Sequence, residues 1–230
     1  MDNHSYAPSY DTSSAVSSLF KSVYLQMAAA LAITGLTAWV VANNEQILYT
    51  IFGSSFGVWG LFIAQIVLVL WLSARVWKMS MFSATILFVL YSVLTGVSLS
   101  VIFLLYTQAS IASAFFTTAG TFLAMSLIGY TSKFDLSKVG NVLFMLLIGL
   151  VIAPVVNIFM KSEGLYWIIT YAGVVIFTGL MAYDTYKLRQ IFTQYGQVDE
   201  MRQKLALMGA FSLYLDFINL FIYLLRIFGS

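Results

Sequence analysis

Seven stretches of about 20 apolar residues, each long enough to cross a bilayer, follow one another along a chain of 230 residues. A helix rises 1.5 Å per residue, so such a length matches the ~30 Å of hydrocarbon in a membrane. One stretch alone could be a buried helix of a soluble protein, but seven in series predict an all-α membrane protein with seven transmembrane helices. A soluble domain has about 25% charged residues, whereas this chain has 9%. The predicted spans are 22–43, 57–76, 82–105, 109–129, 140–160, 166–186 and 207–227.

The sequence divides into a single membrane domain over 21–230 and a polar, serine-rich segment over 1–20 that we expect to be a disordered tail. The tail lacks the cationic region of a signal peptide, so we expect the first apolar stretch to be retained. The charged connection 187–206 is predicted to carry a helical extension of the sixth span. The chain has no cysteine and a net charge of +2, so disulfides and thiolate metal sites are excluded and no nucleic-acid partner is expected.

Lysine and arginine residues fall in alternate connections, as the positive-inside rule requires. With the amino terminus in the cytoplasm and the carboxy terminus outside, only Lys161 and Arg226 of the 11 cationic residues lie on the outer side. The others are Lys21, Arg75, Lys78, Lys133, Lys138, Lys187, Arg189, Arg202 and Lys204. We therefore expect this orientation of the two termini.

Two of the nine acidic residues lie within or at the edge of a span, Asp184 in the sixth and Asp216 in the seventh. An ionised carboxylate at the bilayer centre costs at least ~2.5–3.5 kcal/mol, so it needs a partner or a task. Both aspartates are expected in the cytoplasmic half, where they could meet. Carboxylates ~3 Å apart resist joint ionisation, so a pair would share one proton and act as a pH sensor. In the alternative, Asp184 pairs with Lys187 or Arg189 at the membrane interface.

Five polar residues of the seventh span share one helical face. Ser212, Asp216, Asn219, Tyr223 and Arg226 are spaced four, three, four and three residues apart. Such a face has no use against lipid, so it is predicted to point toward protein or a water-filled cavity. The alternative is that these groups only hold helices together. Interhelical hydrogen bonds average ~0.6 kcal/mol in membranes, too little to offset a buried charge such as that of Asp216.

Other polar residues are candidates for the same cavity. Arg75 and Lys78, at the cytoplasmic end of the second span, are either latches onto the aspartates or ordinary membrane anchors. Gln65 either lines the cavity or bonds to a neighbouring backbone. Pro154 is expected to kink the fifth span. Asn157, one turn further on, either satisfies the carbonyl that the proline frees or supplies an oxygen to an ion path.

Two segments resemble the motifs of a known family. The run AFSLYLDFINLF at 210–221 with LLRIFG at 224–229 resembles the signature of the Bax inhibitor family, bacterial inner-membrane members most closely. The segment GLMAYDT at 179–185, followed by Lys187 and Leu188, resembles the sixth-span motif of that family. The resemblance covers essentially the whole chain and implies a multi-pass protein of the cell inner (plasma) membrane, with the seventh helix surrounded by the other six.

The same resemblance implies a pH-sensitive calcium leak in which Asp184 and Asp216 are the sensor. In some family members an arginine latches onto the sixth-span aspartate, a position that Arg75 or Lys78 would occupy here. Some members have a glutamate where this chain has Gln65, so a calcium path would lack one carboxylate.

We therefore expect a proton-gated cation leak, with Ca²⁺ as the favoured ion and no cofactor beyond the ions themselves. Ca²⁺ prefers oxygen ligands, which Asp184 and Asp216, with Asn219 and Asn157, would supply. A second hypothesis is a non-conducting regulator that binds other membrane proteins or a protease. An enzyme is not expected. The aspartates resemble those of intramembrane aspartyl proteases, but Leu213 and Leu215 replace the glycines of the Gly-x-Gly-Asp motif.

Overall fold

The computed structural model describes residues 12–194 and 200–229, which are almost entirely helical. In order, the elements are α1 (Thr12–Ala42), α2 (Glu45–Phe52), α3 (Ser55–Arg75), η1 (Val76–Lys78), α4 (Met81–Leu99), α5 (Ile102–Leu105), α6 (Gln108–Thr131), α7 (Ser137–Met160), α8 (Glu163–Gln194) and α9 (Glu200–Phe228). Seven segments within this described part are long and apolar enough to cross a membrane, and each overlaps one predicted span. The prediction of a seven-helix membrane protein is confirmed.

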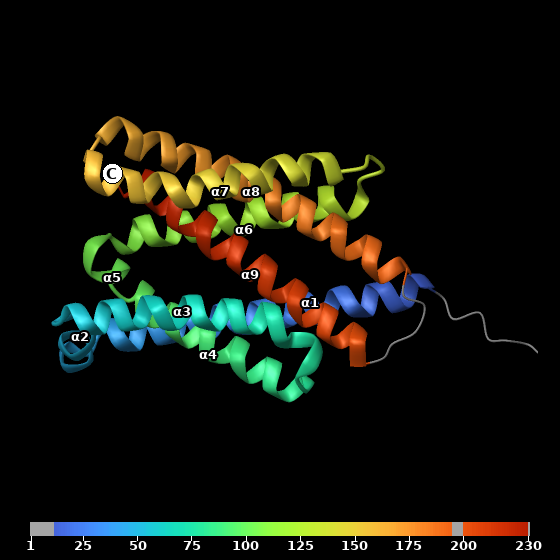
Figure 1. Cartoon of the computed structure of the whole chain (residues 1–230), viewed down its shortest axis with the longest axis horizontal. Helices are drawn as coiled ribbons and strands as arrows, with labels where there is room; N and C mark the ends of the chain where they lie inside the picture. Colours follow the sequence, from blue (N-terminus) through green and yellow to red (C-terminus); the bar gives the residue numbers. More distant parts are fainter. Residues whose placement is uncertain (1–11, 195–199, 230) are drawn as a thin grey trace, which may run out of the picture.

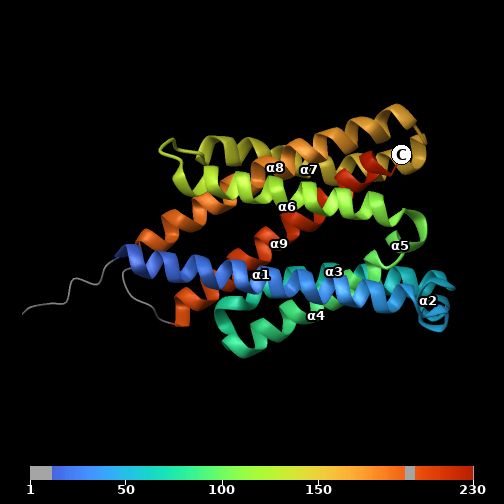
Figure 2. The ribbon, with the colours of Figure 1, turned by 180° about the vertical axis from the view of Figure 1, so that it is seen from behind.

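Helix α9 lies between two groups of helices (Figures 1 and 2). The group α1, α3 and α4 lies on one side and the group α6, α7 and α8 on the other, while α9 crosses diagonally between them. Helix α9 packs against α1, α4, α6 and α8, whereas α3 packs chiefly on α4 and α7 chiefly on α8. Its most apolar stretch is 67% buried, compared with 44% for α8 and 28% or less for the other spans. The last helix is therefore the innermost, flanked by two groups of three rather than by an even ring of six.

One face of α9 is joined to α1 and α4 by aromatic rings and a hydroxyl pair. The ring of Phe88 in α4 packs edge-on against those of Phe211 and Tyr214 in α9. The Tyr214 hydroxyl lies 2.7 Å from that of Thr34 in α1, which also donates a 3.0 Å hydrogen bond to the carbonyl of Ser92 in α4. Within a bilayer polar groups must find protein partners, so these bonds fix the three helices at one depth.

The first helix begins before the predicted membrane domain. Residues 12–20, expected to belong to a disordered tail, form the first turns of α1, so that part of the prediction is wrong. Val16, Leu19, Phe20 and Val23 recur at helical spacing, and each is 6% exposed or less. Serine content suggested a tail, but the apolar stripe buries these turns against the bundle. The rest of the predicted tail, residues 1–11, lies outside the described residues.

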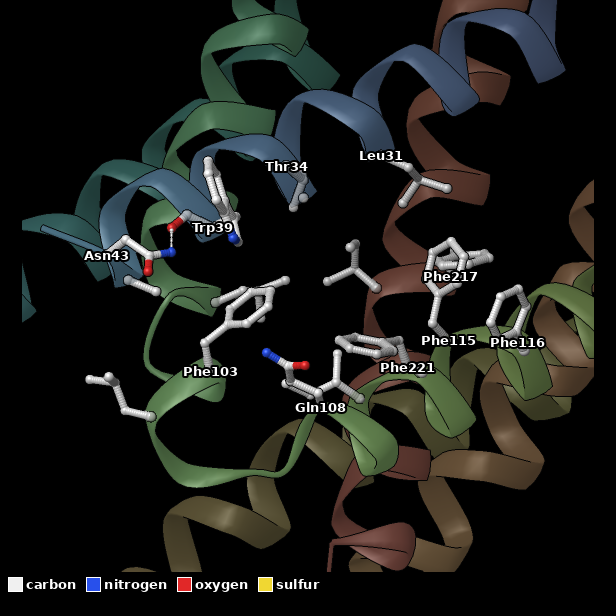
Figure 3. A pocket seen from close by; sticks show the side chains of 17 residues that line it. Leu31, Thr34, Trp39, Asn43, Phe103, Gln108, Phe115, Phe116, Phe217 and Phe221 are labelled. Atoms are coloured by element: carbon white, nitrogen blue, oxygen red, sulfur yellow. Dashed lines mark hydrogen bonds between the residues drawn. The ribbon is translucent and has the colours of Figure 1, made fainter.

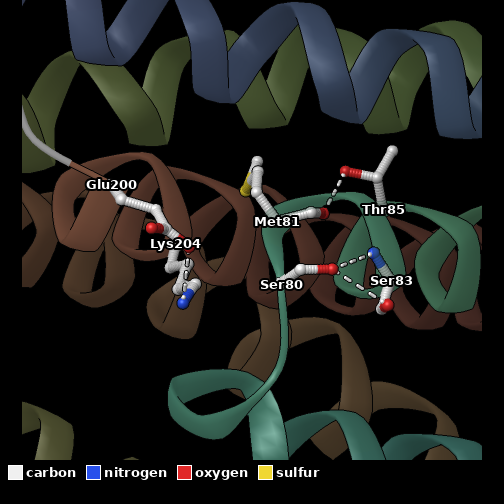
Figure 4. A network of polar contacts seen from close by, with 6 residues as sticks. All are labelled: Ser80, Met81, Ser83, Thr85, Glu200 and Lys204. Atoms are coloured by element: carbon white, nitrogen blue, oxygen red, sulfur yellow. Dashed lines mark hydrogen bonds and ion pairs between the residues drawn. The ribbon is translucent and has the colours of Figure 1, made fainter.

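The predicted helical extension of the sixth span is present, because α8 continues past the expected end of the span at residue 186 to Gln194. After a gap in the description at 195–199, α9 begins beside the start of α4 (Figure 4). There Ser80 caps α4 by accepting the backbone N–H of Ser83, and Lys204 pairs with Glu200 at 3.0 Å. Helix α7 continues through Pro154 without interruption.

The chain connections gather at the two ends of the bundle (Figure 1). The first turns of α1, the end of α3 with η1, the α6–α7 turn, the end of α8 and the start of α9 lie at one end. These segments hold all the cationic residues expected in the cytoplasm. The opposite end holds α2, α5 and the α7–α8 turn, with Lys161, and the end of α9, with Arg226. The segregation of charge fits one membrane orientation, and the side that faces the cytoplasm stays a prediction.

A close approach of α6 and α8 depends on the absence of a side chain at Gly129. A Cβ atom there would lie 2.2 Å from the backbone oxygen of Ala182. We predict that Gly129→Ala lowers the free energy of unfolding by about 1–3 kcal/mol, because two helix backbones must separate. Thermal unfolding of the purified protein in detergent measures the change.

Gly120 on the same helix is the matched control. A Cβ atom there meets nothing within 4 Å. Gly120→Ala should leave stability unchanged or raise it by about 0.5–1 kcal/mol, since alanine favours the helix. Equal effects of the two substitutions would contradict the proposed close packing.

Candidate functional site

Helices α8 and α9 run antiparallel, and the polar face of α9 lies against α8. Near one end of the interface, Gly209 of α9 leaves room for the side chain of Leu188, because a Cβ atom would lie 2.6 Å from it. Near the other end, Gly173 of α8 accommodates the ring of Tyr223, also 2.6 Å from a Cβ atom placed there. These two contacts fix the register that brings the acidic residues of both helices to similar depths.

Asp184 and Asp216 come together with Ser212 at this interface. The Ser212 hydroxyl donates a hydrogen bond to Oδ2 of Asp184. Asp216 lies one helical turn further along α9 and is only 6% exposed. Its Oδ2 atom is buried without a hydrogen-bond partner in the part of the chain that the structure describes. The two carboxyl groups interact electrostatically across the interface.

The alternative role of Asp184, as a carboxylate paired with a cation of the next turn, does not match the contacts. Lys187 is exposed and lies over the ring of Tyr183, 6.0 Å from its centroid, although it acts electrostatically on Asp184. Arg189 donates hydrogen bonds of 2.7 and 3.1 Å to the carbonyls of Tyr130 and Ser132. Over residues 12–194 and 200–229, neither cation forms an ion pair with Asp184, whose bonded partner is Ser212.

The outer part of the polar stripe has a structural setting. Tyr223 stacks on Phe177 of α8 at 5.9 Å, and the Arg226 guanidinium lies 5.1 Å from the Tyr223 ring and 5.4 Å from the Tyr166 ring. Asn219 donates a 2.8 Å hydrogen bond to the carbonyl of Leu215 on its own helix. Ser212, Tyr223 and Arg226 thus face α8, whereas the amide of Asn219 returns to α9.

The structure does not bring the candidate latch residues to the aspartates. Arg75 and Lys78 are both exposed, and with Trp71 and Ser83 they border a cavity of about 400 Å³ between α3 and α4. In the described conformation neither forms an ion pair with Asp184 or Asp216. Their positions at one end of the bundle suit the anchoring role.

Gln65 and Asn157, the other two candidates for lining the cavity, form hydrogen bonds away from the two aspartates. Gln65 of α3 donates a 3.0 Å hydrogen bond to the hydroxyl of Ser98 in α4, so its partner is a side chain and not the backbone. Asn157 accepts the backbone N–H of Ser162 at 3.0 Å in the α7–α8 turn. This bond matches neither role considered for Asn157, and an oxygen supplied by this residue to an ion path stays a prediction. Asn157 caps a turn, and the 22 residues from Ser162 to Asp184 correspond to about 33 Å of helix.

Sequence reasoning missed a buried cation at the start of α9. Arg202, counted only as a marker of orientation, is 1% exposed. One of its terminal nitrogens donates to the carbonyl of Phe192 at 3.2 Å, near the carboxyl end of α8 where free carbonyls attract a cation. Its spacing from Ala206 and Gly209 places it on the buried stripe of α9, and that periodicity could have identified it.

A carboxylate in the α6–α7 turn contrasts with the membrane pair. Asp135 accepts the backbone N–H of Ser137 at 2.9 Å and the Tyr186 hydroxyl at 3.3 Å. Hydrogen bonds from the side chain and backbone of Ser137 hold its pKa below the ordinary aspartate value. Asp135 therefore stays ionised at neutral pH and carries no proton-dependent charge there.

The aspartate pair alone does not form a preorganised metal centre. Among the described residues, no three His, Cys, Asp or Glu side chains lie together so that they could hold a metal ion. Ca²⁺ takes six to eight oxygen ligands, so two carboxylates and the Ser212 hydroxyl would need water to complete its shell. Such a set suits a passing ion better than a resident one.

These features define a seven-helix integral membrane protein with an acidic pair between its last two spans, in which Asp216 is buried and Asp184 half-buried. Residues 16–230 match the protein family described as "Inhibitor of apoptosis-promoting Bax1". The chain belongs to this Bax inhibitor family, as its motifs indicated.

Relatives of known sequence support the assignment over most of the chain. The inner membrane protein YbhL of Escherichia coli K12 is 52% identical over 209 residues, which cover 90% of this chain and 89% of YbhL. An uncharacterised protein of Borreliella burgdorferi is 44% identical over 208 residues, covering 90% of each chain. The uncharacterised protein RP147 of Rickettsia prowazekii is also 44% identical over 208 residues, 90% of this chain and 87% of its own.

The hydrogen bond between Ser212 and Asp184 can be tested directly. Ser212→Ala leaves a carboxylate oxygen in the membrane without its donor, and we predict a loss of about 1–3 kcal/mol in unfolding free energy. Ser100→Ala is the control. Ser100 is buried and Ser212 half-buried, but the Ser100 hydroxyl donates only to the carbonyl of Val97, which the backbone N–H of Ser100 also contacts. Thermal unfolding in detergent should separate the two variants, and equal losses would contradict a special role for the Ser212 bond.

Proposed function

We propose that this protein is a pH-sensitive cation leak of the inner membrane, with Ca²⁺ as the favoured ion and the aspartate pair as the gate. The observation that carries the proposal is the position of the two aspartates at the α8–α9 interface. Ser212 of α9 bonds to Asp184 of α8, and the buried Asp216 lies one turn from Ser212 on α9. The site lies in the interface of the innermost helix, so a change in its charge acts on the helix that contacts both groups of three.

The charge of such a pair depends on pH, because each carboxyl group can gain or lose a proton. Two ionised carboxylates in a low-dielectric site repel each other and lose hydration, so the pair can hold zero, one or two protons. Each state changes the attraction for a cation and the force between α8 and α9. The proposal includes a cytoplasmic amino terminus, which would place the pair in the cytoplasmic half of the membrane.

The unpartnered oxygen of Asp216 is consistent with a site that binds something transiently. A buried polar atom without a partner costs about 1–3 kcal/mol, so it is seldom kept for packing alone. A proton, a water molecule or a cation on Oδ2 would remove this cost. The proposal requires no latch from Arg75 or Lys78.

Calcium flux into liposomes across pH 6–8 tests the proposal. The wild-type protein should show a flux that changes several-fold over this range, while Asp184→Asn and Asp216→Asn should each give a flat pH profile. Asparagine keeps the size of aspartate and removes its titration. The matched control is Asp135→Asn, which should retain the wild-type profile because Asp135 stays ionised throughout the range.

Two results would overturn the proposal. A pH profile that both membrane variants retain would remove the aspartates from gating. The absence of any flux from folded wild-type protein would favour the non-conducting regulator, which binds other membrane proteins, and a partner retained by both aspartate variants would support that role.

A further inference from the structure

A groove between α1 and α6 runs along the membrane-facing side of the bundle, with α9 at its base. Two cavities form it. One, of about 660 Å³, lies toward the start of α1, and the other, of about 560 Å³, lies toward its end. Leu31, Phe115 and Phe217 line both, so the cavities adjoin at these residues. Figure 3 shows the second cavity, with these three side chains at the right, Asn43 at the left and Gln108 between them.

The walls of the first cavity are apolar for most of their length and become polar at one end. Phe20, Met27, Ala28, Ala119 and Phe122 are among the lining side chains. Lys21, Ser17 and Tyr130 lie at the end nearest the amino terminus of α1, and no acidic side chain is among the described lining residues. The Arg189 guanidinium lies 5.8 Å from the centroid of the Tyr130 ring and adds a second positive charge nearby.

The length of this cavity matches one leaflet. From Lys21 to Leu31 is ten residues of helix, or about 15 Å. The hydrocarbon core is ~30 Å thick, so an acyl chain that enters at Lys21 ends near the shared residues at mid-membrane. A cation at headgroup level above an apolar slot of this depth has the arrangement that an anionic phospholipid requires.

We propose that the first cavity, between the first half of α1 and α6, binds one anionic phospholipid. The lipid comes from the leaflet at the amino-terminal end of α1. Its phosphate group contacts Lys21, and one acyl chain lies between the two helices over Phe217. The lipid fills a space between the two groups of three helices that protein side chains leave open. The site is separate from the acidic pair, and the proposal does not depend on ion conduction.

Native mass spectrometry of protein released from nanodiscs tests the site. The nanodiscs contain equal amounts of phosphatidylglycerol and phosphatidylcholine. The wild-type protein should retain one phospholipid and prefer phosphatidylglycerol. Lys21→Gln should lower this preference about fivefold, the contribution of one cation near the membrane surface. Ala28→Phe and Ala119→Phe, which fill the slot, should lose retention of both lipids.

Matched controls keep the result interpretable. Lys138→Gln removes an exposed cation from the same end of the bundle, and Ala29→Phe adds the same ring to an exposed α1 position outside the cavity. Both should bind lipid as the wild type does. Retention of phosphatidylglycerol by both phenylalanine variants would overturn the proposal. Equal retention of the two lipids by the wild type would also overturn it. So would a spectrum in which the wild type forms a dimer and retains no lipid.

Discussion

The contact between α8 and α9 is the constraint on which the rest of the structure depends. A bilayer offers no hydrogen-bond partners, so the polar face of α9 must lie against protein. Ser212 meets this need by donating to Asp184, and Tyr223 by stacking over Gly173 and Phe177. With that face fixed, the opposite face of α9 turns toward α1 and α4. The two groups of three helices then pack around it.

The two sides of α9 are held in different ways. Toward α1 and α4 the contacts are edge-on rings and one hydroxyl pair, in which Tyr214 and Thr34 lie 2.7 Å apart. These groups do not titrate near neutral pH. Toward α8 the contact includes two carboxyl groups, whose charge can change. A change in protonation therefore acts on one side of the central helix while the other side stays fixed, and this asymmetry makes the proposed gate physically reasonable.

Much of this architecture could be predicted from the sequence. Hydrophobic length predicted the seven spans, because the thickness of the bilayer leaves few alternatives. Periodicity predicted the face of α9 that carries Ser212 and Tyr223. Composition misled at residues 12–20, where serines between Val16 and Val23 suggested a tail although the apolar spacing was already helical.

The hydrogen-bond partners of polar side chains were harder to predict than the helices on which these side chains lie. Gln65 and Asn157 look alike in sequence, as amides within apolar spans, yet one bonds to Ser98 and the other caps a turn. Which helix faces a given amide depends on tertiary packing. Arg202 was counted only as a marker of orientation, although its spacing from Ala206 and Gly209 indicated the buried face of α9, and the fold shows its bond to the end of α8. The groove between α1 and α6 could not be predicted from the sequence either, because it lies between two helices that are distant in sequence.

The central claim is that Asp184 and Asp216 titrate as one coupled unit. Infrared spectroscopy of the carboxyl bands in reconstituted protein, recorded against pH and compared with each asparagine variant, tests it most directly. The account predicts two coupled steps in the wild type and a single step at a different midpoint in each variant. If each remaining aspartate titrates at the same midpoint whether or not the other is present, the two groups are independent and the account is contradicted.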